Sequence, residues 1–139
     1  MATLKTNTLT GTSTAGSIAV TGEGNSTTTN LQQGLVKVWV NFDGTASGAA
    51  SRDSFNVSGM TDNGTGDYSF NFSTAFTNTS YCVVTGVYNG TSHGDFQDVD
   101  FMVNSTGNVR IGIGYVSGTG SQMSAHNALG VQIVILGDD

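Results

Sequence analysis

From residue 34 onward the chain alternates apolar and polar side chains in short runs. Successive side chains of a β-strand point to opposite faces, so alternation with a period of two predicts a strand with one buried face. Residues 35–42 fit this pattern, with apolar positions on the side of Val36, Val38, Val40 and Phe42. Further strands are predicted at residues 53–60, 67–73, 81–88, 98–104, 108–116 and 129–136.

The turn between two of these segments is predicted from the sequence TDNGTGD at residues 61–67. Asn63-Gly64 is a strong hairpin signal, because a type I′ turn needs positive φ at both central positions. The same residues superficially resemble a calcium-binding loop, but oxygen side chains are missing at the third and fifth places and no glutamate ends the loop. A tight hairpin is therefore expected here.

Three of the strand segments carry more specific expectations. Segment 81–88, YCVVTGVY, is apolar on both faces and segment 129–136 almost wholly so, which predicts central, buried strands. In segment 108–116, Gly112 and Gly114 lie opposite the apolar face. They leave room for another backbone or a large side chain to approach closely.

The first 33 residues differ from the rest of the chain. Their few aliphatic side chains give too little apolar surface to offset an ordering cost of about 1–2 kcal/mol per residue. Alone, this arm is expected to be disordered, although residues 17–22 alternate and can form a strand on another surface. A solvated tail and an arm that wraps a neighbouring subunit are both open, and the low charge favours the arm.

Together these patterns predict an all-β protein, an antiparallel β-sandwich or jelly-roll-like domain at residues 34–139 with an extended N-terminal arm at 1–33. The 20 glycines and a hydrophobic share of only 37% agree with many turns and few helices. One sandwich cannot hide both faces of every sheet, so the remaining apolar faces indicate a homo-oligomer. The expected subunit interface comprises Leu4, Leu9, Ile18, Val20, Leu31, Leu35 and Trp39.

Charge limits the partners. Four basic residues stand against ten acidic ones, for a formal net charge of −6. A nucleic-acid backbone needs several Lys or Arg side chains in one patch, and an anionic membrane repels an acidic protein. Neither nucleic acid nor membrane is expected as a partner.

Cysteine usage and the N-terminus bear on the compartment. Cys82 is the only cysteine, so an intrachain disulfide is impossible, and the residue is expected to be a small buried hydrophobe. The opening MATLKTNTLTGTSTAG lacks the apolar run of a signal peptide. The chain is therefore expected to be made in a cytoplasm and to reach the outside, if it does, by another route.

The titratable residues suggest no catalytic machinery. His93 and the aspartates at 95, 98 and 100 could supply metal ligands, but a polar loop followed by a half-exposed strand explains them better. No nucleophile elbow of the form G-x-S-x-G precedes a helix. We expect no enzyme activity, no metal and no cofactor.

Carbohydrate binding is the more serious possibility for a site. Sugars are held by aromatic platforms together with amide or carboxylate hydrogen bonds. The residues expected to offer these groups from loops are Tyr88, Asn89, His93, Asp95 and Tyr115.

Two long stretches of the chain resemble a recurring family segment. GEGNSTTTNLQQGLVKVWVNFDGT and SFNVSGMTDNGTGDYSFNFSTAF, with the strand YCVVTG, resemble a β-rich module of tail-fibre and other virion structural proteins of tailed bacteriophages, especially marine and cyanobacterial ones. The resemblance covers most of the chain and is densest at residues 22–88.

The resemblance implies a β-rich appendage protein that is assembled in the host cytoplasm and carried on the virion. Such proteins are commonly trimers whose arms intertwine near the axis. The expected role is non-enzymatic host attachment in a tail fibre or spike, with other virion proteins and a host surface glycan as partners. A capsid decoration protein and a free-standing carbohydrate-binding module are the alternatives.

Overall fold

The structure, a computed structural model, describes residues 3–14, 17–88, 96–116 and 123–137. The chain divides into two units, Met1–Leu35 and Val36–Asp139, where the sequence predicted a boundary after residue 33. The described residues form antiparallel strands and one short 3-10 helix, so the predicted all-β class is confirmed.

The N-terminal unit is built around a small hairpin. Strand β1 (Ala19–Thr21) pairs antiparallel with β2 (Thr28–Asn30), and the 3-10 helix η1 (Gln32–Gly34) follows. All six strand residues are exposed. The strand expected within residues 17–22 is thus present, and its pairing partner comes from its own unit.

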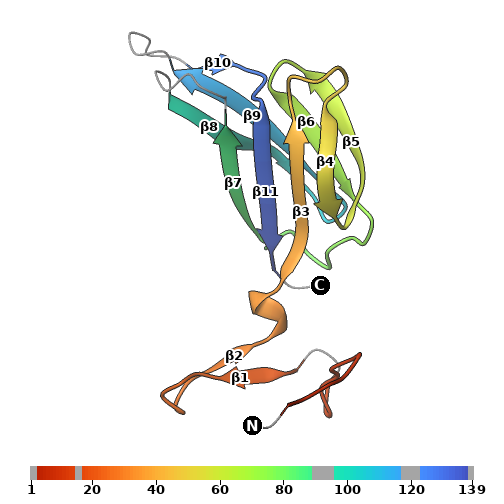
Figure 1. Cartoon of the computed structure of the whole chain (residues 1–139), viewed down its shortest axis with the longest axis vertical. Coiled ribbons are helices and arrows are strands. Elements are labelled where there is room, and N and C mark those ends of the chain that lie inside the picture. Colours follow the sequence, from red (N-terminus) through yellow and green to blue (C-terminus); the bar gives the residue numbers. More distant parts are fainter. Residues whose placement is uncertain (1–2, 15–16, 89–95, 117–122, 138–139) are drawn as a thin grey trace. The chain divides into compact units, whose positions relative to one another are not determined.

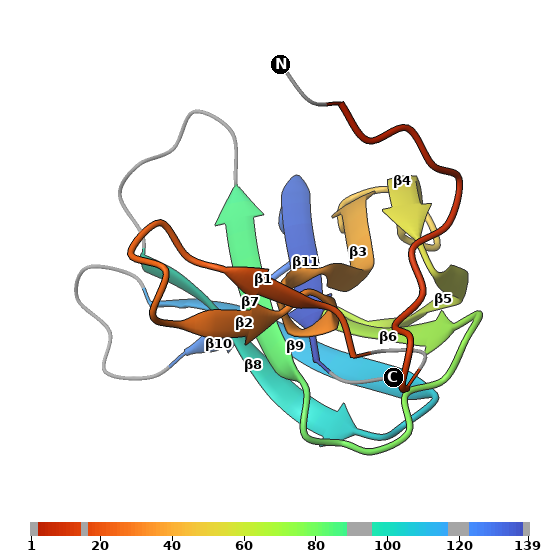
Figure 2. The same cartoon turned by 90° about the horizontal axis from the view of Figure 1, so that it is seen from below.

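Two antiparallel sheets make up the C-terminal unit. One has four strands in the order β4-β3-β11-β7. The other has the order β10-β9-β6-β5, and its fifth strand, β8, also pairs with β9. Figure 2 shows β7, β11, β3 and β4 side by side in one layer, with β8, β9 and β6 in the other. The bounds are β3 Val36–Asp43, β4 Ala50–Phe55, β5 Val57–Gly64, β6 Asp67–Phe72, β7 Cys82–Tyr88, β8 Phe96–Asn104, β9 Asn108–Val116, β10 Ser124–Ala125 and β11 Gly130–Leu136.

The core lies between the two sheets and follows the predicted alternation. In β3, β6, β9 and β11 the buried residues fall mainly at alternate positions, and Gly114 of β9 and Gly130 of β11 are buried as well. Phe42 of β3 packs against Tyr68 and Phe70 of β6, with ring centroids 5.0 and 5.2 Å apart. Burial raises the pKa of Tyr68 to about 12. The inward faces are Val38, Val40 and Phe42; Tyr68, Phe70 and Phe72; Val109, Ile111 and Ile113; and Val131, Ile133 and Ile135.

The single strand predicted at residues 53–60 is wrong. Asn56 has a φ of 56° and ends β4 in the four-stranded sheet, and β5 begins at Val57 in the other sheet. The amide of Asn56 holds this corner: Nδ2 donates to the carbonyl oxygens of Lys37 (3.2 Å) and Thr74 (3.1 Å), and Oδ1 accepts from the Thr74 N–H (2.7 Å). Asparagine tolerates the left-handed conformation, which explains how the alternation continues through a change of sheet.

The predicted hairpin between β5 and β6 is present, but its turn lies elsewhere. Gly64 pairs with Asp67, so the turn residues are Thr65 and Gly66 rather than Asn63-Gly64. Gly66 has a φ of 69°, and a Cβ there would lie 2.4 Å from the Ile113 carbonyl oxygen. The turn therefore forms where a glycine meets β9, a strand distant in sequence, because only glycine fits against the β9 backbone at this position.

Strand β7 is an edge strand, so the prediction of a central, buried strand at 81–88 is wrong. Val83 and Val87 pack against the core, whereas Val84 and Tyr88 are exposed on the other face. Cys82 is exposed as well, which corrects the expectation of a buried thiol. The expected central position of the last strand is confirmed, because β11 lies between β3 and β7 (Figure 1).

Candidate interaction surfaces

The outer face of the four-stranded sheet carries apolar side chains from every strand. Phe55 of β4 pairs with Trp39 of β3, which pairs with Val134 of β11, which pairs with Val84 of β7. Directly paired residues project to the same side of a sheet. We call these four residues the apolar row. Its two ends, Phe55 and Val84, are 53% and 52% exposed, and its two central residues are half-buried.

A polar row runs beside the apolar row. Two residues along each strand, Asp53 pairs with Asn41, Asn41 with Gln132, and Gln132 with Gly86. A Cβ at Gly86 would lie 3.0 Å from Gln132 Oε1, so the glutamine side chain lies across the glycine. Among these four residues Asp53 carries the one charge. The outer face therefore changes from apolar to polar within two residues along each strand.

An ion pair between Arg52 and Asp43 lies beyond the polar row, near the end of β3. Arg52 Nη2 donates to Asp43 Oδ2 at 2.9 Å and to the Leu129 carbonyl oxygen at 2.6 Å. Hydrogen bonds from Thr45, and more weakly the charge of Arg52, lower the pKa of the Asp43 carboxyl. Arg52 thereby ties β3 and β4 to the segment that precedes β11, a structural role for one of the four basic residues.

The second surface is a groove on the five-stranded sheet, which we call the glycine groove. A Cβ at Gly112 would lie 3.2 Å from Met102 Sδ, and one at Gly114 would lie 2.8 Å from Met123 Cε. The expectation that these glycines admit a large side chain is confirmed, since both methionines close over them. The groove has a volume of about 380 Å³. Its lining also includes Asp67 and Asp100.

The two carboxylates of the glycine groove differ in their partners. Arg110 Nε donates to Asp67 Oδ1 at 2.8 Å, and Asn63 Nδ2 donates to the same oxygen at 3.3 Å. The hydrogen bond from Arg110 lowers the pKa of Asp67, and burial opposes this effect. Asp100 is exposed, and among the described residues no hydrogen bond reaches its carboxylate.

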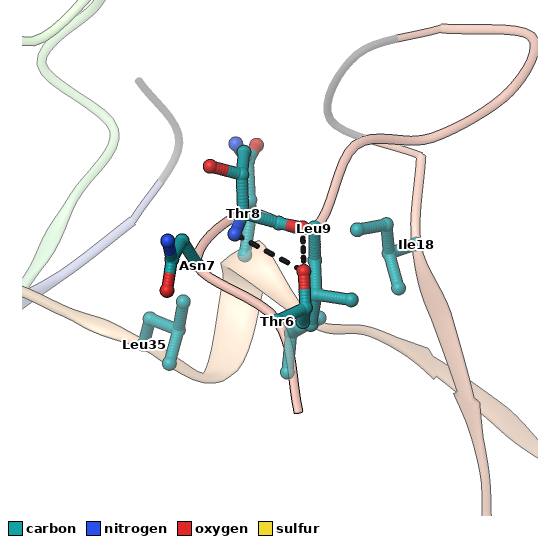
Figure 3. Close-up of a pocket in the computed structure, with 8 residues that line it drawn as sticks. Thr6, Asn7, Thr8, Leu9, Ile18 and Leu35 are labelled. Atoms are coloured by element: carbon teal, nitrogen blue, oxygen red, sulfur yellow. Dashed lines mark hydrogen bonds between the residues drawn. The ribbon is translucent and has the colours of Figure 1, made fainter. Parts of the chain in front are cut away.

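A third hollow lies within the N-terminal unit (Figure 3). Leu9, Ile18, Leu31 and Leu35 line it, together with the polar residues Thr6, Asn7, Thr8 and Gln32, and its volume is about 330 Å³. Thr6 Oγ1 donates to the Thr8 carbonyl oxygen at 2.7 Å within this lining. Four of the residues predicted for a subunit interface thus come together around one cavity.

The other predicted interface residues have different surroundings. Leu4 is 78% exposed and Val20 is 50% exposed, both in the N-terminal unit. Trp39 is half-buried in the apolar row. Phe55, Val84 and Val134 complete that row but were not predicted, because their alignment depends on strand register.

Of the predicted sugar-binding residues, Asn89, His93 and Asp95 lie outside the described residues. Tyr88 ends β7 and is 53% exposed, whereas Tyr115 of β9 is half-buried with its ring 5.2 Å from that of His126. The two tyrosines belong to different sheets. Asp98 and Asp100 are exposed on β8, as the half-exposed strand interpretation expected.

The described residues hold no group of three or more His, Cys, Asp or Glu side chains arranged to bind a metal ion. Nor does that part of the chain contain a helix long and apolar enough to cross a membrane.

Comparison of the chain with protein-family models, curated proteins and solved structures finds no match.

Proposed function

We propose that the protein is a non-enzymatic structural protein of a tailed-bacteriophage particle, a tail-fibre or spike-type appendage that takes part in host attachment. The resemblance of residues 34–44, 54–72 and 81–86 to virion proteins supports this role. The all-β architecture with antiparallel sheets is compatible with it. The proposal assigns no catalytic step, no cofactor, and no nucleic-acid or membrane partner.

The observation that carries the proposal is the exposed apolar surface of the N-terminal unit. Leu4, Leu9 and Val20 are between 50% and 78% exposed, and Leu35 is 48% exposed. Burying one such side chain fully stabilises an assembly by about 1.5–3 kcal/mol. A partner that covers this unit would gain several such contributions, so we assign the unit to assembly or anchoring on the particle.

In this proposal the C-terminal unit is a jelly-roll-like sandwich that faces outward, and the arms join three copies. The protein is made in the host cytoplasm and leaves the cell on the virion. Other virion proteins are its partners at the N-terminal unit, and a host surface glycan is its partner at the exposed domain.

Incorporation into particles tests the anchoring role. Leu4→Ser removes an exposed apolar side chain of the N-terminal unit that supports little of the unit's own packing. The matched control, Met102→Ser, removes an exposed apolar side chain of the five-stranded sheet. We expect purified particles to lose most of the Leu4→Ser protein and to retain the control. Equal incorporation of both variants contradicts the proposal. Gold labelling of the retained protein then distinguishes a tail appendage from capsid decoration on the head.

A carbohydrate-binding module is the second candidate function, and two features favour it. The glycine groove is large enough for a sugar ring, and the exposed Asp100 lies in its lining. Tyr88 offers an exposed aromatic face elsewhere on the domain. Binding of host polysaccharide to the free protein, lost in Asp100→Asn or Tyr88→Ala, supports this candidate. Absence of binding by the wild type removes it.

A further inference from the structure

The apolar row crosses all four strands of its sheet, and its side chains are graded in size. In strand order the residues are Phe55, Trp39, Val134 and Val84, so two aromatic rings occupy one half and two valines the other. We propose that this outer face pairs with the same face of a second copy, related by a two-fold axis that runs parallel to the strands between β3 and β11. The inference goes beyond the proposed function, because it concerns the domain whatever its place on a particle.

Shape complementarity selects this axis. The strand order within one copy is β4-β3-β11-β7 (Figure 1). A two-fold axis parallel to the strands reverses this order, so β4 of one copy lies over β7 of the other and β3 lies over β11. Phe55 then faces Val84 of the second copy, and Trp39 faces its Val134. Large residues opposite small ones fill the roughly 10 Å between two packed sheets without overlap or voids.

The polar row matches itself about the same axis. Asn41 faces Gln132 of the second copy, which lets the two amides donate to and accept from each other. Asp53 faces Gly86 of the second copy, a position that has no side chain of its own and that the Gln132 side chain of that copy covers. The two Asp53 carboxylates lie about three strand spacings, roughly 14 Å, apart, beyond the screening length of about 8 Å in physiological salt.

A two-fold axis perpendicular to the strands fits the face badly. Phe55 would meet Phe55 and Trp39 would meet Trp39, while valine would face valine across a gap. The polar row would also lie against Leu136 and its neighbours rather than against itself. The order of residues along the row therefore distinguishes the two arrangements.

The size of the face sets the expected strength of pairing. Four strands about 4.8 Å apart and seven residues at about 3.3 Å give a face of roughly 400 Å² per copy. Both copies together bury about 800–900 Å², which is the range of weak and transient interfaces. The net charge of −6 on each copy opposes association, so pairing should tighten as salt is added.

The test uses full-length protein and reciprocal charges. Phe55→Glu and Val84→Lys each place one unpaired charge in both of the 55–84 contacts of a pair, and each variant alone should associate at least about ten-fold more weakly than wild type. In an equimolar mixture the new carboxylate at position 55 faces the new ammonium at position 84 across one contact, and the other contact keeps its native residues. The mixture should therefore recover association that neither variant shows alone, which an unfolded variant would not allow.

Sedimentation equilibrium between about 1 µM and 1 mM measures the mass over the range expected for such an interface. Pairing doubles the mass of whatever assembly the arms produce, and each single variant should halve it. Trp39 is the single tryptophan, so its fluorescence should become less accessible to quenchers on association. Met102→Glu on the five-stranded sheet is the control and should behave as wild type. A mixture no better than its components, or a wild-type mass equal to that of the single variants at every concentration, overturns the pairing.

Discussion

Replacing Asn56 should reveal how strongly one residue holds the corner between the two sheets. Its side chain makes three hydrogen bonds to backbone groups of Lys37 and Thr74, at 3.2, 3.1 and 2.7 Å. A hydrogen bond contributes about 0.5–1.5 kcal/mol net, and these lie partly exposed, so the three together contribute about 2 kcal/mol. At a φ of 56°, a residue that has a Cβ and makes no compensating contact destabilises the fold by about 1 kcal/mol more.

Three substitutions separate these contributions. Asn56→Asp keeps the acceptor for the Thr74 N–H and loses both donors, for an expected loss of about 1 kcal/mol of unfolding free energy. Asn56→Gly loses all three hydrogen bonds but adopts the positive φ without strain, so the unfolding free energy should fall by about 2 kcal/mol. Asn56→Ala loses the bonds and keeps the strain, for about 3 kcal/mol, a large part of the 5–15 kcal/mol typical of a domain.

Urea unfolding followed by the fluorescence of Trp39, the neighbour of Phe55 on the adjacent strand, measures these losses. The measurement should be made at a protein concentration low enough to exclude association. An alanine variant within about 0.5 kcal/mol of wild type would refute the role of the corner. Equal stability of the alanine and glycine variants would refute the backbone part of the reasoning and leave the hydrogen bonds intact.

Three other substitutions test the packing and electrostatics of the domain. Tyr68→Phe removes a buried hydroxyl 2.7 Å from Asn127 Oδ1 and should lower the unfolding free energy by about 1–3 kcal/mol in the same urea assay. Arg110→Gln removes the partner that lowers the pKa of Asp67. The wild type should therefore have a higher unfolding free energy than the variant above pH 3.8, and this difference should disappear as the pH falls through the lower, folded-state pKa of Asp67. Urea unfolding at a series of acidic pH values measures the difference. Gly66→Ala forces a Cβ into a left-handed position against the backbone of β9, and should cost at least about 2 kcal/mol in thermal unfolding.

The chain offers a matched control for the glycine substitution. Gly107 has open space around its would-be Cβ, and its φ does not favour glycine. Gly107→Ala should therefore leave the thermal midpoint nearly unchanged. A loss equal to that of Gly66→Ala would show that the cost does not come from the contact with β9, because the effect of Gly→Ala on the unfolded chain is stabilising.

Much of the sandwich could be predicted from the sequence because its central strands have one buried face. In β6, and in β9 as far as Ile113, the alternation is regular and burial follows it residue by residue. The outer glycines of β9 also indicated that another backbone or a large side chain would approach them closely. These features are local, so a window of a few residues contains the information.

The errors arose where long-range contacts decide the structure. The alternation across residues 53–60 continues through Asn56, so the pattern does not show that the strand changes sheet. The turn forms at Thr65 and Gly66 because β9 approaches there, which the favourable pair Asn63-Gly64 cannot reveal. Strand β7 looked central because its outer face is apolar too.

The candidate surfaces were predictable only in part. Trp39 stood out as an apolar residue on the wrong side of its strand, and the arm's leucines stood out in a polar segment. Recognising Phe55, Val84 and Val134 as one row needs the register of three strand pairs, and register depends on bulges such as the one between Asn41 and Phe42.

The corner at Asn56 also constrains how the gene can vary. Phe55 and Val57 are separated by one residue yet belong to different sheets. No loop lies between β4 and β5 that could accommodate an additional residue. A one-codon insertion or deletion there would turn every following side chain of β5 to the opposite face. Among natural variants of this chain, length differences should therefore be absent between positions 55 and 57, and asparagine or glycine should dominate at the position between them.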